Sequence, residues 1–451
     1  MSNKIKIGVV TLGCDKNRVD SEKMLYSLVN GGFELTNDFN LADCLIVNTC
    51  AFIDSAKKEA IETILELAEF KKSGVCKALI VTGCLSQKYA GEIKDELKEV
   101  DAFLGVRDYD SILSIINKLV GADVVGATHC RPQIVKTDGA GNENTKRILT
   151  TPQHYAYLKI ADGCNNCCSY CTIPSIRGKY ISRPLQDLIG ETQDLIKAGV
   201  KELIVVAQDV TRYGQDIDSG YKLVDLLKEL VKTDIEKIRL MYCYPELVTD
   251  ELLDFVANDD KMVKYLDIPF QHINDRILKL MNRNSNSGTI LNLVKRIRNL
   301  NKYIAVRSTF IVGFPGETEG EFDELCNFVK AAKLDHVGIF EYSKQDGTPA
   351  ALLKGQISDA VKQKRHKTLA KIQYENVIEF NKSMVGKTVK VTYEGIDYDK
   401  NLFYGRSQFS APDIDTLVYF TADFVDIGCD YDVLITGYDG YDLAGQLTTY
   451  N

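Results

Sequence analysis

The chain has 451 residues, of which 45% are hydrophobic and 26% charged, and its formal net charge is −8. This composition is typical of a globular protein with about three domains. No stretch approaches the ~20 apolar residues of a membrane helix. The apolar run near the N-terminus also lacks the length and the cleavage site of a signal peptide. We therefore expect a cytoplasmic protein that does not associate with membranes.

Thirteen cysteines are an unusual number for such a protein. Disulfides are rare in the cytoplasm, and an odd count does not allow complete pairing, so the cysteines indicate metal or redox chemistry. Some of them lie within or beside apolar runs and are predicted to be small buried hydrophobic residues: Cys44, Cys76, Cys243, Cys326 and Cys429. Cys130 lies in a polar stretch and has no predicted role.

Strands alternate with helices through residues 1–125, which predicts a doubly wound parallel sheet. Three predicted strands end at Cys14, Cys50 and Cys84, which are 36 and 34 residues apart. Because ligand sites form along the carboxyl edge of such a sheet, we expect the three thiols to meet there. They suit a 4Fe–4S cluster with one position that no cysteine fills. A zinc ion with a fourth ligand, or three thiols simply buried in loops, are the alternatives.

A polar linker, residues 126–152, precedes a second series of strands and helices over residues 153–382. Six strands are predicted, at 154–161, 201–207, 237–244, 264–269, 304–312 and 335–342. With right-handed crossovers they form a partial (βα)6 barrel. Functional residues of such barrels lie on the loops after the strands, which here carry cysteines, polar residues and glycines.

The loop after the first barrel strand reads "DGCNNCCSYC" and contains the spacing CxxxCxxC at Cys164, Cys168 and Cys171. This spacing, with Tyr170 before the last cysteine, resembles the radical S-adenosylmethionine enzymes. The resemblance implies a 4Fe–4S cluster whose free iron binds the amino and carboxylate groups of S-adenosylmethionine. Three thiolates with one open position fit that role. A zinc knuckle is the alternative. Cys167 breaks the spacing, so we expect it not to be a ligand.

Other loops of the barrel carry weaker candidates. Gln208 and Asp209 are predicted to contact the cofactor, or else to cap a helix. Gly313 and Phe314 begin "GFPGE", which resembles a loop near the cofactor in these enzymes but is otherwise a tight turn. His272 is a candidate substrate contact or a structural histidine.

Residues 383–451 contain short strands broken by Gly, Asp and Pro, which predicts a small antiparallel barrel. With the preceding domains it resembles a TRAM domain, an OB-like module often used on RNA. It contains four basic and eleven acidic residues, a net charge of −7. RNA binding depends on Lys and Arg, so we expect a basic protein partner and no direct RNA binding. Alternatively, the acidic residues only maintain solubility.

The whole chain resembles the radical S-adenosylmethionine methylthiotransferases. Four segments are similar to the branch that modifies an aspartate of small-subunit ribosomal protein number twelve: "TLGCDKNRVDSE" (11–22), "NTCAFI" (48–53), "IPSIRG" (173–178) and "DIPFQHINDRILKLMNR" (267–283). The branch that modifies tRNA adenosines usually has a "QSG"-type segment where this chain has Gln271, His272 and Ile273. Asp15 stands where the family often has Pro, beside a cysteine ligand but without affecting ligation.

The resemblance implies a transferase that adds a methylthio group to the β-carbon of the aspartate. The cluster on Cys164, Cys168 and Cys171 would cleave S-adenosylmethionine to a radical that removes hydrogen from this carbon. A second, auxiliary cluster on the three N-terminal cysteines would present the methylated sulfur. The implied partners are a basic ribosomal protein, an external electron donor and a sulfur source, and we expect a monomer. A tRNA adenosine methylthiotransferase and a non-catalytic iron–sulfur or zinc scaffold remain the alternatives.

Overall fold

The computed structural model describes residues 4–120, 133–135, 146–218 and 220–448. Its contacts divide the chain into two units, which are described separately. Unit 1 comprises Met1–Thr150, Asp162–Asn165 and Cys171–Glu191, and unit 2 comprises Thr151–Ala161, Asn166–Tyr170 and Thr192–Asn451. Most of the predicted linker (126–132 and 136–145), together with Cys130, lies outside the described residues.

Unit 1 contains a six-stranded parallel sheet with the strand order β2-β1-β3-β4-β5-β6. Its strands are β1 (Lys6–Thr11), β2 (Glu34–Leu35), β3 (Cys44–Thr49), β4 (Ala78–Gly83), β5 (Ala102–Leu104) and β6 (Gln133–Val135). Its helices are α1 (Asp15–Asn30), α2 (Asp54–Ser73), α3 (Cys84–Ile93), α4 (Ile112–Val120) and α5 (Ile173–Arg177), with short 3-10 helices η1 (Phe39–Leu41) and η2 (Tyr109–Ser111).

Both faces of this sheet are buried. Leu45 and Val47 of β3 belong to a core with α2 and α3, whereas Ile46 belongs to a second core with α1 and α4. Successive side chains of a strand point to opposite faces, so a run of apolar residues supplies both cores at once. The predicted doubly wound sheet is therefore confirmed.

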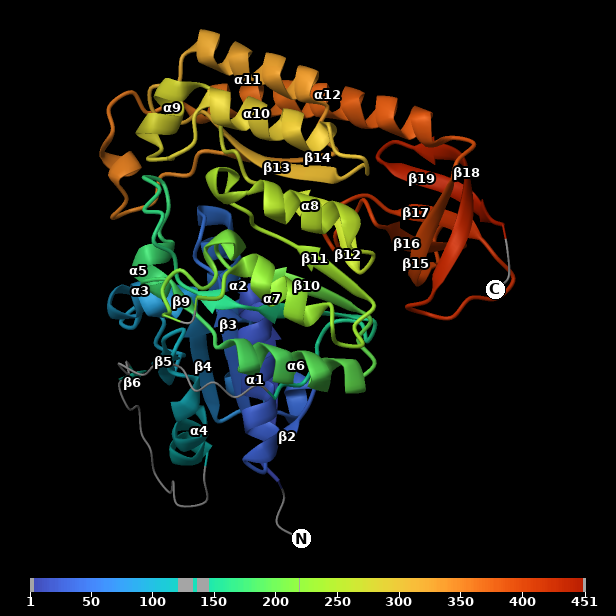
Figure 1. Cartoon of the computed structure of the whole chain (residues 1–451). Coiled ribbons are helices and arrows are strands. Elements are labelled where there is room, and N and C mark those ends of the chain that lie inside the picture. Colours follow the sequence, from blue (N-terminus) through green and yellow to red (C-terminus); the bar gives the residue numbers. More distant parts are fainter. Residues whose placement is uncertain (1–3, 121–132, 136–145, 219, 449–451) are drawn as a thin grey trace. The chain divides into compact units, whose positions relative to one another are not determined.

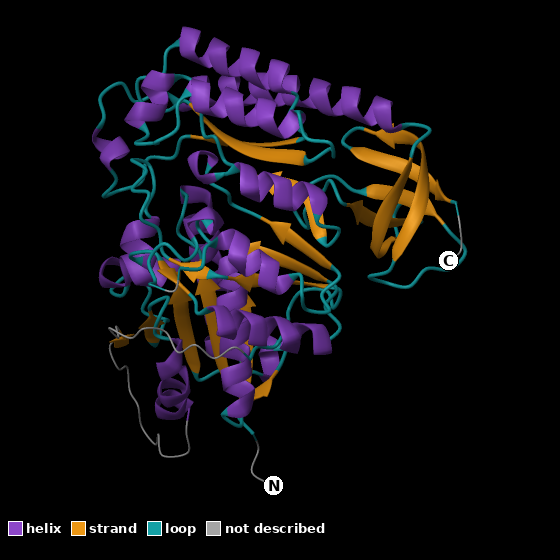
Figure 2. Cartoon of the chain, viewed as in Figure 1, coloured by secondary structure: helices purple, strands orange, loops and turns teal. Residues whose placement is uncertain are grey.

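Unit 2 contains the predicted partial barrel, whose six parallel strands follow the order β14-β13-β12-β11-β10-β7. They are β7 (Tyr155–Lys159), β10 (Glu202–Val206), β11 (Lys237–Leu240), β12 (Met262–Asp267), β13 (Ala305–Val312) and β14 (His336–Glu341). A two-stranded pair follows β7 in the chain: β8 (Ala161–Asp162) begins at the last residue of the Thr151–Ala161 segment of unit 2, and β9 (Ile181–Ser182) belongs to unit 1. Figure 2 shows the strands and helices by colour.

The barrel helices complete the expected alternation of strand and helix. They are α6 (Leu185–Lys197), α7 (Leu223–Leu230), α8 (Asp250–Asn258), α9 (Asp275–Leu280), α10 (Ser287–Arg298), α11 (Glu319–Ala332) and α12 (Asp359–Met384), with 3-10 helices η3 (Val210–Arg212), η4 (Pro245–Leu247) and η5 (Pro349–Leu352). Helix α12 packs along β14 and reaches the last strands of the chain (Figure 1). No helix in the described ranges is both long and apolar enough to cross a membrane.

The C-terminal residues form a closed five-stranded barrel. Its strands are β15 (Thr388–Asp397), β16 (Leu402–Ser407), β17 (Val418–Thr421), β18 (Asp430–Asp439) and β19 (Asp442–Leu447). Four of its pairings are antiparallel as predicted, but β17 and β19 pair in parallel. Closure leaves no unpaired strand edge, which suits a domain this small.

Buried and partly buried polar contacts attach this small barrel to strands of the larger barrel, two of them at the amino ends of the strands. Arg406 of β16 binds Glu202, the first residue of β10, at 3.0 Å. Asp430 accepts a hydrogen bond from Lys237, the first residue of β11, at 2.5 Å. The hydroxyl of Tyr265 donates to Asp415 at 2.6 Å. The small barrel therefore lies at the end of the larger barrel opposite to the loops that carry the predicted site residues.

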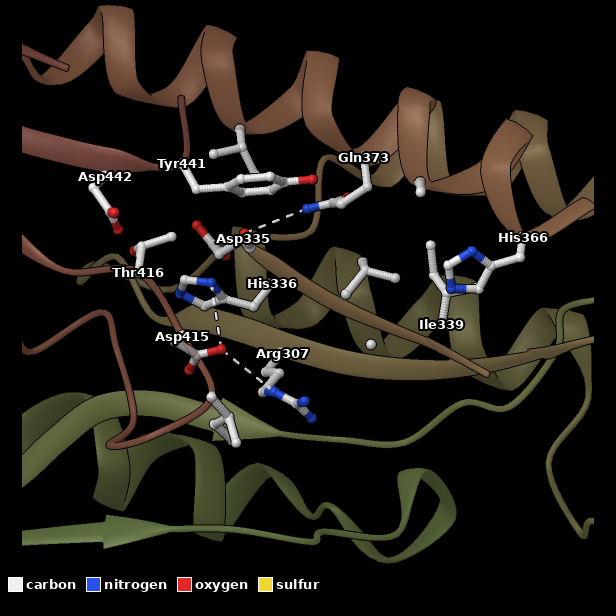
Figure 3. Close-up of a pocket in the computed structure, with 15 residues that line it drawn as sticks. Arg307, Asp335, His336, Ile339, His366, Gln373, Asp415, Thr416, Tyr441 and Asp442 are labelled. Atoms are coloured by element: carbon white, nitrogen blue, oxygen red, sulfur yellow. Dashed lines mark hydrogen bonds and ion pairs between the residues drawn. The ribbon is translucent and has the colours of Figure 1, made fainter. Parts of the chain in front are cut away.

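A cavity of about 380 Å³ lies at this junction, between β13, β14, α12 and the small barrel. Figure 3 shows Asp415 between His336 and Arg307, with contacts of 3.5 and 3.4 Å. Because Arg307 and His336 are near the amino ends of their strands, this cavity is not at the predicted site. The residues that line it include none of the predicted site residues.

The cysteines predicted to be buried differ in their exposure. Cys44, Cys76 and Cys243 are buried as expected, with exposed fractions of 0, 5 and 0%. Cys326 and Cys429 are only partly buried, which corrects the prediction for these two. Cys326 lies on the surface helix α11, and the sulfur of Cys429 is 3.5 Å from the Lys201 ammonium at the domain junction.

Candidate functional site

Cys14, Cys50 and Cys84 follow three adjacent strands of the sheet in unit 1. Cys14 precedes α1, Cys50 follows the last residue of β3, and Cys84 begins α3. Since β1, β3 and β4 are neighbours and parallel, the three cysteines lie along one edge of the sheet. Gly13 allows the first two to approach: a Cβ added there would lie 2.7 Å from the Cys50 Cβ and 3.2 Å from its sulfur.

The thiols at this edge influence one another electrostatically. Burial raises the pKa of Cys84 to about 12, Arg177 opposes that rise, and the Cys14 and Cys50 sulfurs add to it. Burial also raises the pKa of Cys50. Thiols of this kind become thiolates when a cationic metal centre compensates their charge, so the donor set suits a metal centre.

The thiols are not arranged around a single ion. Within the described ranges, no group of three or more His, Cys, Asp or Glu side chains is placed to hold one metal ion. In a 4Fe–4S cluster each thiolate binds a different iron, so the sulfurs lie further apart than around zinc.

The second set of cysteines lies on the loop after β7 and β8. The sulfur of Cys168 is buried and lies 2.9 Å from the Tyr244 hydroxyl. Burial raises the pKa of Tyr244, so its hydroxyl keeps its proton and can donate it in a hydrogen bond to a thiolate. Arg283 lies 3.9 Å above the Tyr244 ring and 3.8 Å from the same sulfur. These groups would compensate a negative sulfur.

Cys171 and Cys164 belong to unit 1, whereas Cys168 belongs to unit 2. The sulfur of Cys171 accepts a hydrogen bond from the Ile173 backbone N–H at 3.4 Å. The backbone N–H of Cys164 donates to the Gly178 carbonyl at 3.1 Å. The chain brings the three cysteines within eight residues, and the contacts of Cys168 and Cys171 suit metal-bound thiolates.

Cys167 differs from its neighbour Cys168. It is exposed and adopts a φ of +49°, a left-handed conformation that non-glycine residues seldom adopt. Its carbonyl accepts a hydrogen bond from the Asn282 side chain at 2.8 Å. Cys167 thus contributes its backbone to the loop while its side chain remains exposed.

We therefore predict that Cys167→Ser leaves the iron content and the cleavage of S-adenosylmethionine unchanged after anaerobic reconstitution. The reason is that serine keeps the backbone contact and removes only an exposed thiol. Iron analysis and product chromatography measure both quantities, with Cys168→Ser as the matched control that should lose them. A large loss in Cys167→Ser would mean that this thiol is a ligand.

Asp209 lies at the end of β10 and is buried. It caps η3 by accepting a hydrogen bond from the Thr211 N–H at 3.1 Å, and it also accepts one from Asn166 of the cysteine loop at 3.0 Å. The carbonyl oxygen of the Gln208 side chain is buried and has no hydrogen-bond partner in the described part of the chain. Asp209 thus has the capping role and also holds the cysteine loop, and cofactor contact by either residue stays a prediction.

The "GFPGE" loop is closed by its own carboxylate. Glu317 accepts hydrogen bonds from the N–H groups of Gly313 and Phe314. Phe314 is buried and packs its ring edge-on against Tyr342. The imidazole of His272 is also buried, accepts a hydrogen bond from the Asn274 N–H and lies 3.9 Å from Glu317. These contacts explain the local structure, and roles toward cofactor or substrate stay predictions. The partly buried ring of Tyr170 packs with Phe314 and Tyr342 in the same apolar cluster.

Sequence reasoning gave no role to Arg177, Tyr244 or Arg283. The sequence offered two signals: Arg177 and Arg283 lie inside the segments that resemble the family, and Tyr244 lies at the carboxyl end of the third predicted barrel strand. The partners of Cys168 are 76 and 115 residues away along the chain, so no local pattern reveals the contacts.

Three family models match the chain. The model "Uncharacterized protein family UPF0004" matches residues 6–105, the radical SAM superfamily matches 158–329, and the TRAM domain matches 385–448. Together they cover the N-terminal sheet, the partial barrel and the small barrel.

Among solved structures, the chain is similar to the radical S-adenosylmethionine methyltransferase TsrM from Kitasatospora setae. The TM-score is 0.54 at 15% identity, and the match covers 78% of this chain and 74% of TsrM. At this identity the likeness establishes the fold.

Curated relatives match over nearly the full length. The chain is 47% identical over 444 residues to "Ribosomal protein uS12 methylthiotransferase RimO" of Clostridium botulinum (strain Loch Maree / Type A3), covering 98% of both chains. It is 46% identical over 443 residues to the protein of the same name from Thermoanaerobacter sp. (strain X514), covering 98% of this chain and 99% of the relative. The chain therefore belongs to the RimO family of ribosomal protein uS12 methylthiotransferases.

Proposed function

We propose that this chain adds a methylthio group to the β-carbon of an aspartate in ribosomal protein uS12. The observation that carries the proposal is the presence of two separate sets of three cysteines in a chain of this family. A single set would serve cofactor cleavage alone. The second set, along the carboxyl edge of the N-terminal sheet, gives a place for the sulfur.

Cys164, Cys168 and Cys171 would hold the 4Fe–4S cluster that binds S-adenosylmethionine. When bound, the cluster and S-adenosylmethionine together would supply the one-electron chemistry that an unactivated C–H bond requires. The protein's part is to position the loop and exclude water. Asn166 contributes by bonding both Asp209 and the Arg212 guanidinium, whose Nε lies 2.9 Å from the asparagine oxygen. Burial of the Cys168 sulfur keeps water from one side of the site.

Cys14, Cys50 and Cys84 would hold an auxiliary 4Fe–4S cluster. Their support is the alignment at one sheet edge and the mutual influence of their thiols. The proposal also requires an external electron donor and a sulfur source, and the chain would act as a monomer.

The small barrel would bind the substrate protein through its acidic loops. Asp426 and Asp439 are exposed, as are the apolar side chains of Phe424 (69%) and Ile427 (60%). A negative surface with apolar residues suits a basic protein and repels RNA. This barrel is attached near the amino ends of the strands, whereas the predicted site residues lie at the carboxyl ends. The bound protein would therefore have to extend along the larger barrel to reach them.

The test is a comparison of two substrates. The reconstituted wild-type protein is incubated with S-adenosylmethionine, a reductant and a sulfide source, and with either purified uS12 or tRNA. We expect mass spectrometry to find one added methylthio group on an aspartate of uS12 and none on tRNA. Modification of tRNA alone would overturn the proposal in favour of a tRNA methylthiotransferase. Failure to cleave S-adenosylmethionine at all would favour a non-catalytic scaffold.

A double variant tests the docking surface within the same experiment. Asp426→Asn with Asp439→Asn removes two exposed negative charges, so we expect a higher KM for uS12 with kcat almost unchanged. The matched control is Asp254→Asn, which removes an exposed charge from α8 of the larger barrel. An equal effect of both changes would exclude specific docking by the small barrel.

A further inference from the structure

The guanidinium of Arg177 is buried within unit 1, with only 2% of the residue exposed. Arg177 ends α5, six residues after Cys171, so it lies on the segment that continues the cysteine loop. This segment, Cys171–Glu191, belongs to the same unit as Cys14, Cys50 and Cys84. A buried charge in this position requires partners.

The guanidinium binds two carboxylates and an amide. Its Nη1 donates to Asp20 at 3.0 Å and to both oxygens of Asp162 at 3.1 Å. Its Nη2 donates to the side-chain oxygen of Asn17 at 3.0 Å. Asp20 and Asn17 lie on α1, the helix that begins directly after Cys14. The planar fork of an arginine suits this arrangement, and a lysine could not reproduce it.

Arg177 also acts electrostatically on the N-terminal thiols. It interacts with the sulfurs of Cys14, Cys50 and Cys84, and it opposes the rise in pKa that burial causes at Cys50 and Cys84. Its carboxylate partners offset part of this effect, since Asp20 adds to the rise in the pKa of Cys84. Without Arg177 both carboxylates would lose this compensating cation in the same unit as the three thiols. Arg177 is thus a buried cation that acts on the sulfurs of the proposed auxiliary site.

The partners of Arg177 extend to the strand ends that carry these cysteines. The Asn17 amide donates to the carbonyls of Leu12 and Thr49, at 2.9 and 3.0 Å. Leu12 lies just before Cys14 in the chain, and Thr49 lies just before Cys50. The Thr49 hydroxyl donates to the Thr82 carbonyl at 2.6 Å, close to Cys84. These bonds connect all three strand ends, and Arg177 fixes the orientation of the Asn17 amide.

We propose that Arg177 is a positioning residue of the auxiliary site, which holds the thiol-bearing strand ends in register and balances the negative charge of a bound cluster. The inference rests on the proposed second cluster. A buried cation near a cluster stabilises its reduced state, because reduction adds negative charge. Residues that hold ligands in place also strengthen metal retention, typically by 10-fold or more.

The experiment uses the full chain with Cys164, Cys168 and Cys171 replaced by alanine, so that only the auxiliary site can bind a cluster. Arg177→Met removes the charge and keeps an apolar side chain of similar length. Arg177→Lys keeps the positive charge but loses the planar set of hydrogen-bond donors of the guanidinium. The matched control is Arg183→Met, which removes another buried arginine of the same segment, one that pairs with Glu191 at 2.6 Å. Iron retention against a chelator and the midpoint potential, followed by electron paramagnetic resonance, are the readouts.

We expect Arg177→Met to lower the midpoint potential and to retain iron about 10-fold less well than the parent. Arg177→Lys should restore the potential toward that of the parent while retaining iron less well. Arg183→Met should leave the potential unchanged. If Arg177→Met and the parent have equal potentials and iron retention, or if Arg183→Met shifts both equally, the inference is wrong. If the parent itself binds no iron, the second cluster of the proposed function is wrong instead.

Discussion

Replacing Cys14, Cys50 and Cys84 together with alanine is expected to halve the iron of the reconstituted protein, from about eight to about four per chain, the content of one 4Fe–4S cluster. The reason is that these thiols supply all the protein ligands proposed for the auxiliary cluster. Cleavage of S-adenosylmethionine should persist, because its cluster depends on the other three cysteines. Methylthio transfer to uS12 should be abolished, since the sulfur site is missing.

The reciprocal variant, with Cys164, Cys168 and Cys171 replaced by alanine, should also retain about four irons. It should lose cleavage of S-adenosylmethionine entirely. Iron analysis together with chromatography of the cleavage products distinguishes the two variants. A third variant, in which serine replaces the exposed or partly exposed Cys167, Cys326 and Cys429, is the matched control and should retain full iron.

Unchanged iron in the first variant would exclude the auxiliary site. Loss of all iron in either variant, with the protein still folded, would mean that the six cysteines serve one site. The circular dichroism spectrum of each variant separates that outcome from unfolding.

Arg406→Met is expected to lower the free energy of unfolding by about 3–5 kcal/mol, the usual effect of removing one partner from a buried ion pair. Arg406 is 2% exposed and binds two carboxylates of its unit, Glu202 at 3.0 Å and Glu394 at 2.7 Å. Methionine would remove this cation from both carboxylates. In the part of the chain that the structure describes, Glu394 would keep His154 at 3.0 Å and Glu202 would keep Arg239 at 2.6 Å. Urea denaturation followed by circular dichroism measures the change.

Two comparisons interpret this result. Lys333→Met removes an exposed ion pair with Glu379 and should change stability by no more than about 1 kcal/mol. Combining Arg406→Met with Glu394→Gln removes both charges of one pair and should recover part of the loss. If Arg406→Met lowered the free energy of unfolding no more than Lys333→Met, the buried ion pairs of Arg406 would not be important for attaching the small barrel.

The same buried ion pairs determine how the free energy of unfolding depends on pH. Burial alone would raise the pKa of Glu202, but Arg239 and Arg406 outweigh burial and hold the pKa well below its usual range. The stabilisation is therefore complete above the unfolded pKa of about 4.3 and is lost as the pH falls below it. In Arg406→Met the folded pKa is higher, so the acid-induced loss from this group should be smaller.

The sequence was sufficient for the architecture. Continuous apolar strands such as residues 44–49 are buried on both faces, and this pattern predicted a parallel sheet with helices on either side. The carboxyl ends of parallel strands share one edge, so spacing alone placed Cys14, Cys50 and Cys84 on it. The short strands β2 and β6 were not predicted, because two or three residues carry too little periodicity.

The sequence also predicts that Cys168 and not Cys167 is a ligand, because ligand spacing is a local property, and the structure adds that Cys168 is buried and Cys167 exposed. The sequence could not predict that Tyr244 and Arg283 would surround the Cys168 sulfur, or that Arg406 would enter the base of the larger barrel. Those contacts join residues 76 to 204 positions apart, and side-chain pairing at such separations depends on how the elements pack.

The sequence by itself thus determined the class of fold and predicted the two sets of cysteines, because these depend on local periodicity and on the order of strands in a parallel sheet. The family followed from the resemblance of its motifs. Only the tertiary structure decided which charges surround the sulfurs. Arg177 illustrates the difference: the "IPSIRG" segment was visible in the sequence, but its buried cation acquires a role only when packing places it beside thiols that are about 90 to 160 residues away. A buried charge needs compensation, and the groups that compensate it are those brought near by the fold.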